Sequence, residues 1–268
     1  MNAPAMGSKP KGRLFLVPAP LDFGCDDQTP LAPLTDVLPL ATLQTAAKLQ
    51  HWVCENAKST RAYLKRVDTI CPLSEPIQAL NIKELPREVH KKGDHPGSLG
   101  ASFDAKPLLA AALAGSDVGL VSEAGMPAIA DPGSSVVRAA HELGIQVIPL
   151  VGPISLMLAL ACSGLNGQNF AFVGYLPQDT AQRTQRIKEL ESIALKTGQT
   201  QLFIETPYRN TALLQNLFHT LQGTTRLAVS CGLTLATATT HSASLSNWRR
   251  QSPNHLALAL PAVFGIGL

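Results

Sequence analysis

A run of small and acidic residues at positions 122–133, SEAGMPAIADPG, directly follows an apolar segment that ends at Val121. It holds two prolines, two glycines and two acids, and no part of it favours a helix. Small residues let a ligand approach the main chain closely, and prolines leave carbonyl groups without a competing local donor. The run therefore suits a ligand cradle made of backbone groups. A surface turn and a simple strand-to-helix connection are the alternatives.

Two further segments share this chemistry, VPAP at 17–20 and VGPIS at 151–155. In open α/β sheets ligands bind beyond the carboxyl ends of strands, where such segments lie. No G-x-G-x-x-G follows the first apolar run, LFLVPAPLDFG, and no GxxxxGK[ST] occurs in the chain. A pyrophosphate would need a nest of amides of that kind. The pattern thus favours a nucleoside-like ligand without phosphates.

Short runs rich in Val, Ile, Leu and Phe recur, and each is closed by proline, which predicts strands covered on both faces. They lie within residues 13–20, 117–127, 145–153, 170–177 and 201–207. Helical patterns separate them, at 107–114, 134–143, 184–196 and 210–221. Strands that alternate with helices predict an α/β fold. We place a domain boundary where VGP turns into an apolar helix, which gives domains 1–151 and 152–268.

Two segments are predicted to lie outside the regular elements. Residues 1–12 have the composition of a loose, disordered tail. Residues 87–105, REVHKKGDHPGSLGASFDA, are polar and Gly-rich without a clear period, which favours a long mobile loop, either functional or a disordered insertion.

The bulk composition narrows the class of protein. The net charge of +3 is far from the dense basic patch typical of nucleic-acid-binding domains. The five cysteines form no CxxC pair, so we expect reduced thiols and no metal site. The most apolar window, residues 145–162, is interrupted by Pro149, Gly152 and Pro153, which argues against a membrane span. These features predict a cytoplasmic protein.

Several blocks, in order, resemble the tetrapyrrole methylase family, the class III S-adenosylmethionine-dependent methyltransferases. SEAGMPAIADPG resembles the family's SDAGTPxISDPG, and the other blocks are LFLVPAP, HWVCENAKSTRAYL, VIPLVGPISLMLALACSGL, FAFVGYLP and LFIETPYR. CENAKSTR and LFIETPYR are closest to the branch that methylates a ribose 2′-hydroxyl of small-subunit ribosomal RNA. The resemblance implies two α/β domains, each a mixed sheet with helices, a cofactor in the trough between them, and a homodimer.

The resemblance also implies which residues bind S-adenosylmethionine. The methionine side of the cofactor would contact Pro18, Ser122, Ala124 and Gly125, and Ser155 would donate a hydrogen bond. The adenine would lie against Tyr175, Leu176 and Pro207. Simple packing is the alternative for Pro18 and Leu176.

A hydroxyl acceptor benefits from a general base, and Glu55 in CENAKSTR is the first candidate. Arg61 and Lys58 would hold a phosphate, although Glu55 and Arg61 would equally suit a structural ion pair. Glu123 would orient the loop or face the substrate. Further candidates are Asp94 and two histidines in the 87–105 segment, His90 and His95.

Other charged residues are predicted to have structural roles or to bind RNA. Asp131 is predicted to cap the helix that follows it. Glu205 and Arg209 are predicted to form an interdomain or dimer pair. An RNA substrate would meet a rim of basic side chains, Lys58, Arg61, Lys65, Lys91 and Lys92.

The chain departs from the family pattern in ways that leave the acceptor open. Glu123 replaces an aspartate, Met126 replaces a threonine, and Asn56 follows Glu55 where the RNA-methylating branch has a second acid. We therefore keep three hypotheses: an rRNA methyltransferase that acts on the 30S subunit, a methyltransferase for a tetrapyrrole or other small molecule, and an inactive cofactor-binding module.

Overall fold

A computed structural model describes residues 10–22, 31–95, 103–251 and 255–268, and leaves out the side chains of residues 90–92 and 251. The chain divides into two compact units, the first made of residues 1–20 and 33–153 and the second of residues 21–32 and 154–268. Each unit holds a five-stranded sheet with helices on both faces, which confirms the α/β prediction.

The sheet of the first unit has the order β3-β2-β4-β1-β5, and all four pairings are parallel. A mixed sheet was expected, but helical segments lie between the strands along the chain, which suits parallel pairing. The strands are β1 (Leu14–Val17), β2 (His51–Cys54), β3 (Asn81–Glu84), β4 (Val118–Val121) and β5 (Val147–Pro149).

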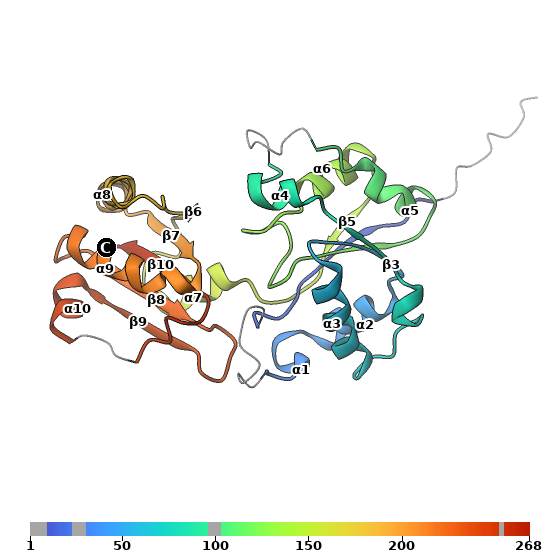
Figure 1. Cartoon of the computed structure of the whole chain (residues 1–268), viewed down its shortest axis with the longest axis horizontal. Coiled ribbons are helices and arrows are strands. Elements are labelled where there is room, and N and C mark those ends of the chain that lie inside the picture. The colour runs from blue at the N-terminus through green and yellow to red at the C-terminus, as the bar shows by residue number, and fades with distance from the viewer. Residues whose placement is uncertain (1–9, 23–30, 96–102, 252–254) are drawn as a thin grey trace, which may run out of the picture. The chain divides into compact units, whose positions relative to one another are not determined.

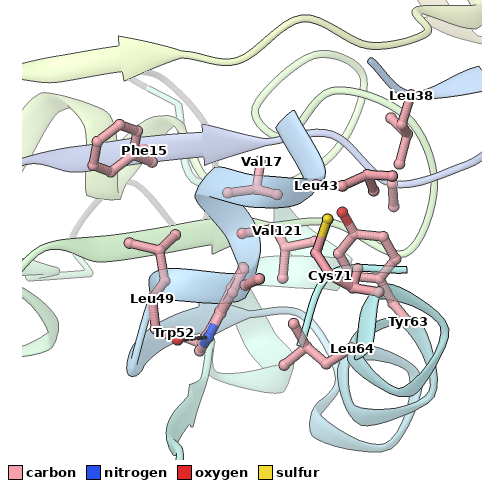
Figure 2. Packing of buried hydrophobic residues seen from close by; sticks show 14 of the residues in the cluster. Phe15, Val17, Leu38, Leu43, Leu49, Trp52, Tyr63, Leu64, Cys71 and Val121 are labelled. Atoms are coloured by element: carbon pink, nitrogen blue, oxygen red, sulfur yellow. Dashed lines mark hydrogen bonds between the residues drawn. The ribbon is translucent and has the colours of Figure 1, made fainter. Parts of the chain in front are cut away.

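Alternate residues of these strands feed two cores. Phe15 and Val17 face a cluster with Trp52 and with α1 (Leu34–Val37), α2 (Leu40–Lys48) and α3 (Ala57–Asp68). Figure 2 shows Trp52 and Leu64 in this cluster. Leu14 faces the opposite cluster, which involves η2 (Lys106–Leu109), α5 (Ala110–Leu113) and α6 (Ser134–Glu142). This period of two is what a strand buried on both faces requires.

The second unit has a mixed sheet of order β6-β7-β10-β8-β9, in which only β6 and β7 run parallel. Its strands are β6 (Phe170–Tyr175), β7 (Thr200–Glu205), β8 (Arg226–Cys231), β9 (Thr239–Ser244) and β10 (Ala262–Gly267). Its helices are α7 (Ser155–Ser163), α8 (Thr180–Thr197), η3 (Pro207–Arg209), α9 (Asn210–Thr220) and α10 (Leu245–Gln251). The apolar side chains of α7 cover one face of the sheet, and those of α8, α9 and α10 cover the other.

The segments predicted to be irregular are partly ordered. Residues 1–9 and 96–102 lie outside the described residues, but Gly12 is buried and donates its N–H to the Ala112 carbonyl at 2.8 Å. The predicted loop at 87–105 begins with helix α4 (Arg87–Lys92). Pro86 precedes that helix and Val89 anchors it with an exposed fraction of 2%. The element η1 (Ile77–Ala79) completes the described set. No helix among the described residues is both long and apolar enough to span a membrane.

Two of the Pro/Gly segments meet inside the first unit. A Cβ atom at Gly152 would lie 2.3 Å from Cγ of Pro18 and 3.0 Å from Cδ2 of Leu38. The proline ring cannot move aside as a flexible side chain would. The close approach of VGP to VPAP therefore depends on glycine.

We predict that Gly152→Ala destabilises the first unit by about 1–3 kcal/mol because of this overlap. Labelling with 5-fluorotryptophan allows ¹⁹F NMR in urea to follow each unit separately, since the only two tryptophans, Trp52 and Trp248, lie in different units. Gly167→Ala is the control, because a Cβ there meets no atom within 4 Å. An unchanged midpoint for the Trp52 signal would contradict the prediction.

Candidate active site

Three candidate residues lie at one edge of the first sheet because each directly follows a strand. Pro18 follows β1, Glu55 follows β2 and Ser122 follows β4, and these strands are neighbours in the order β2-β4-β1. The register pairs Val121 with both Val17 and Cys54, so the three strands end at the same level. The carboxyl edge of a parallel sheet is the usual place for a ligand in this architecture.

The loop after β4 has an unusual backbone. Between Gly125 and Gly133, four residues have positive φ: Gly125 (68°), Ala128 (64°), Ala130 (64°) and Gly133 (133°). Alanine pays a steric cost in the left-handed region, of order 1–2 kcal/mol per residue. Such conformations persist only where the surroundings hold them, and they cluster at functional sites.

The first end of this loop is held by a two-way backbone bridge. The Ala19 N–H donates to the Gly125 carbonyl at 2.9 Å, and the Gly125 N–H donates to the Ala19 carbonyl at 3.0 Å. The buried Tyr63 hydroxyl donates to the Pro18 carbonyl at 3.4 Å. The bridge therefore brings Pro18 beside Ala124 and Gly125, as a shared binding site would require, while the Pro18 ring packs against Gly152.

The second end of the loop is held by Asp94, which lies 40 residues before Ser134. Asp94 Oδ2 accepts the N–H groups of Gly133 and Ser135, both at 2.9 Å. The hydroxyls of Ser134 and Ser135 donate to the same carboxylate at 2.8 and 2.7 Å. Burial acts to raise the pKa of Asp94, but these bonds outweigh it and lower the pKa. Asp94 thus caps helix α6, and the prediction that Asp131 caps it is wrong, because Gly133 occupies the N-cap position.

Two acids that follow strands come into direct contact. Oε2 of Glu55 accepts the N–H of Glu123 at 3.3 Å, and Oε1 of Glu123 accepts the hydroxyl of Ser59 at 3.1 Å. Burial raises the pKa of Glu55 from 4.5 to about 8, and the nearby charges of Asp131, Glu123 and Asp94 add to the rise. Burial, with a contribution from Glu123, raises the pKa of Asp131 to about 7.

Two buried oxygens of residues that follow β2 and β4 lack partners. Oε1 of Glu55 and Oγ of Ser122 accept or donate no hydrogen bond to any of the described residues. Buried polar atoms in this state are rare, and they suit a polar ligand that completes their hydrogen bonds. The Ser122–Gly125 segment therefore fits a ligand with polar groups. No three His, Cys, Asp or Glu side chains within residues 10–22, 31–95, 103–251 and 255–268 are placed to hold a metal ion.

The predicted anion-binding side chains lie on helix α3. Lys58, Arg61 and Lys65 are exposed, and their spacing places them on one face of the helix. Among the described residues, Arg61 forms no ion pair with Glu55, so the alternative structural pair is not present. The side chains of Lys91, Lys92 and His90 lie outside the described residues.

The first backbone N–H groups of α3 already have hydrogen-bond acceptors within the protein. Oδ1 of Asn56 accepts the N–H groups of Lys58 and Ser59, and Oε1 of Glu84 accepts the N–H of Ala57 at 2.6 Å. The α3 N-terminus therefore offers no free amides of these three residues to a phosphate.

The remaining candidates lie in the second unit. Tyr175 ends β6, and Pro207 follows the parallel neighbour β7, so Tyr175, Leu176 and Pro207 share one sheet edge. The Leu176 side chain is 3% exposed within the core, as its packing alternative requires. Ser155 begins α7, which packs against one face of the same sheet, including Leu202 of β7.

The predicted interdomain or dimer pair of Glu205 and Arg209 proves to lie within this unit. Nη2 of Arg209 lies 2.7 Å from Oε1 of Glu205, one helical turn away along the chain. Arg209 also donates to the Thr206 hydroxyl at 3.1 Å. The pair is local because η3 turns the chain back over the end of β7.

Sequence reasoning did not find the capping role of Asp94 or the supporting bonds from Ser59 and Glu84. Asp94 stands in a Gly-rich segment whose pattern carries no signal for a partner 40 residues away. Glu84 ends a strand, and its proximity to α3 follows only from the pairing of β2 with β3. Long-range caps of this kind lie beyond the reach of local patterns.

We predict that the first unit loses stability as the pH rises from about 5 to 8. In this range the unfolded chain has released the Glu55 proton while the folded chain retains it, so a higher pH favours unfolding. Glu55→Gln removes the free-energy cost of ionising Glu55 in the folded state. This variant should therefore be more stable than the wild type at pH 8.5 by about 1–3 kcal/mol. Urea unfolding from pH 5 to 9 tests this. Exposed Glu75→Gln is the control, and parallel curves for wild type and Glu55→Gln would exclude the assigned titration.

Comparison with known proteins identifies relatives along much of the chain. Residues 40–247 match the profile of the family described as tetrapyrrole (corrin/porphyrin) methylases. A protein of Mesorhizobium japonicum named ribosomal RNA small subunit methyltransferase I is 31% identical over 207 residues, 77% of this chain and 62% of the relative. A protein of the same name from Halalkalibacterium halodurans is 31% identical over 199 residues, 74% of this chain and 57% of the relative.

The matched part thus spans less than two thirds of either relative. The crystal structure of the methyltransferase CobJ shares the fold, with a TM-score of 0.52, 16% identity, and coverage of 87% of this chain and 88% of that one. The family profile covers more than half of the 268 residues, including the SEAGMP loop, Glu55 and the LFIETPYR block. The chain therefore belongs to the tetrapyrrole (corrin/porphyrin) methylase family.

Proposed function

We propose that this protein is an S-adenosylmethionine-dependent methyltransferase that acts on ribosomal RNA, at a ribose 2′-hydroxyl. The proposal is supported by the family and by the names of the relatives, ribosomal RNA small subunit methyltransferase I. The observation in the molecule that carries it is the contact of the half-buried Glu55 with the start of the 122–133 loop, at the carboxyl edge of three parallel strands.

The cofactor would be held at the loop by Ser122, Ala124 and Gly125, where Oγ of Ser122 is buried and unpartnered. In the second unit, Ser155 and the sheet edge with Tyr175, Leu176 and Pro207 would bind its other parts, as the family resemblance implies. S-adenosylmethionine supplies an electrophilic methyl group on a sulfonium. Methyl transfer is an in-line displacement, so the main task of these residues is alignment and exclusion of water.

Glu55 is proposed as the general base that receives the proton of the acceptor hydroxyl at Oε1. That oxygen is the one without a partner, while Oε2 is oriented by the Glu123 N–H. A carboxyl whose pKa is about 8 is a stronger base once ionised than one with an ordinary pKa, and it matches a reaction near neutral pH. A positive charge bound nearby would favour the ionised form.

The RNA would be bound through the exposed row of Lys58, Arg61 and Lys65 on α3. Each phosphate contact releases counterions, so the affinity should depend on salt. The homodimer stays a prediction from the family resemblance, and the cytoplasmic location stays a prediction from the composition.

A small-molecule acceptor such as a tetrapyrrole is the second candidate. The observation in its favour is that Glu55, Glu123 and Asp131 near the loop are all acidic, so none of these side chains would attract an RNA phosphate. An inactive cofactor-binding module is the third hypothesis, and it differs in having no turnover.

We predict micromolar binding of S-adenosylhomocysteine in calorimetry, and methyl transfer to unmodified 30S subunits. With three phosphate contacts, the affinity for an rRNA fragment should fall about 50-fold or more between 0.1 and 0.5 M salt. Salt-independent binding would favour the small-molecule alternative. Cofactor binding without turnover on RNA or tetrapyrrole would favour the inactive module, and no binding of S-adenosylhomocysteine would refute the proposal as a whole.

We predict that Glu55→Gln lowers the rate of methyl transfer by about 100-fold or more, because the amide cannot accept the proton. The dissociation constant of S-adenosylhomocysteine should change little, since Gln keeps the size and an oxygen acceptor. Glu75→Gln serves as the matched surface control. A wild-type rate for Glu55→Gln would exclude Glu55 as the base.

A further inference from the structure

We propose that Asp94 is a positioning residue that fixes the strained 125–133 loop from its far end and thereby holds Asp131 beside Glu55. This inference deepens the proposed function and rests on it for its catalytic meaning. The anchoring itself depends only on the geometry of the first unit.

The carboxylate of Asp94 is buried and accepts four hydrogen bonds. It is 3% exposed and accepts two backbone N–H groups and two hydroxyls, all from Gly133, Ser134 and Ser135. Nη2 of Arg138 donates to the Asp94 carbonyl at 3.1 Å, which ties the Asp94 main chain to the same helix. A charged acceptor at the first turn also opposes the positive end of the α6 dipole.

The loop needs such an anchor because its own hydrogen bonds are few. Between the Ala19–Gly125 bridge and the Asp94 cap, the only backbone bond that the described residues form within the loop runs from Ile129 N–H to the Met126 carbonyl, and it is long at 3.4 Å. Ala128 and Ala130 hold left-handed conformations within this stretch. Without a fixed far end, these alanines can relax to negative φ, because no other backbone bond among the described residues holds the stretch.

The position of Asp131 follows from the same anchor. Asp131 precedes Gly133 by two residues, so the capped end of the loop limits where its carboxylate can lie. Its charge acts on Glu55, together with those of Glu123 and Asp94, which are the acidic groups that face Glu55 from the neighbouring elements. Loss of the cap would free the backbone beside Asp131, whose charge has the largest effect of these three on the pKa of the proposed base.

The experiment uses the full chain with Asp94→Ala and Asp94→Asn, and with Asp179→Ala as the matched control. Asp179 caps α8 in the second unit through the Gln182 N–H at 2.9 Å, so its loss removes a cap without touching the loop. Asp94→Asn keeps one acceptor oxygen and is the milder variant. Hydrogen exchange measures protection of the amides at 128–135, and ¹³C NMR of labelled Glu carboxyls, assigned with Glu55→Gln, follows Glu55.

We expect exchange at 128–135 to be at least about tenfold faster in Asp94→Ala, with Asp94→Asn in between, and unchanged in Asp179→Ala. The Glu55 carboxyl signal should titrate at lower pH in Asp94→Ala and, to a smaller extent, in Asp94→Asn. Unchanged exchange in both Asp94 variants would overturn the inference. The link to Asp131 would be overturned if both variants shifted the Glu55 titration by the same amount, since both remove the Asp94 charge and only that charge would then act on Glu55.

Calorimetry with S-adenosylhomocysteine separates this inference from the proposed function. If the wild-type protein binds the compound and Asp94→Ala binds it at least about tenfold more weakly while Asp94→Asn partly recovers, both stand. If the wild type does not bind, the proposed function fails, and the exchange data still decide whether Asp94 holds the loop.

Discussion

The left-handed backbone of the loop between Gly125 and Gly133 is the constraint on which the site depends. The steric cost of this backbone is offset by hydrogen bonds at its two ends. These are the bridge to Ala19 after β1 and the Asp94 cap on α6. The bridge needs β1 and β4 to be neighbours, and the cap needs the chain after α4 to return to α6. The parallel order of the first sheet is therefore a condition for the loop geometry as well as for the core.

The acids beside this loop also lower the stability of the folded state. Glu55 and Asp131 lie where burial disfavours their charged forms, and neither forms an ion pair in the described part of the chain. A core chosen for stability alone would replace such groups with apolar ones. Three features coincide at one sheet edge: acids with raised pKa values, buried oxygens without partners, and a strained loop. This combination is typical of a functional site.

The sequence predicts the parts of this site that follow from local pattern. Proline-closed apolar runs mark β1, β4 and β7, and the composition of SEAGMP indicates a backbone cradle. What it misses depends on partners far apart in the chain. Asp131 stands at the right distance for a local cap, yet Asp94 forms the cap from 40 residues away. Glu205 and Arg209 suggest a long-range pair, yet they are local because η3 turns the chain. Periodicity reports which face of an element is buried, and it contains no information about which loop meets which helix.

The start of α3 indicates that attraction of an anion and selection of the reacting group depend on different residues of the first unit. Asn56 and Glu84 already accept the first amides of the helix, so the backbone cannot provide a specific phosphate site there. Attraction for an anion is left to Lys58, Arg61 and Lys65, whose exposed charges act at long range and with little geometric selection. Selection must then come from groups with fixed geometry, and in the first unit these are the orphaned oxygens of Glu55 and Ser122. A substrate held mainly by α3 would be oriented only when its reacting group satisfies those oxygens, which would link recognition to the step proposed for Glu55.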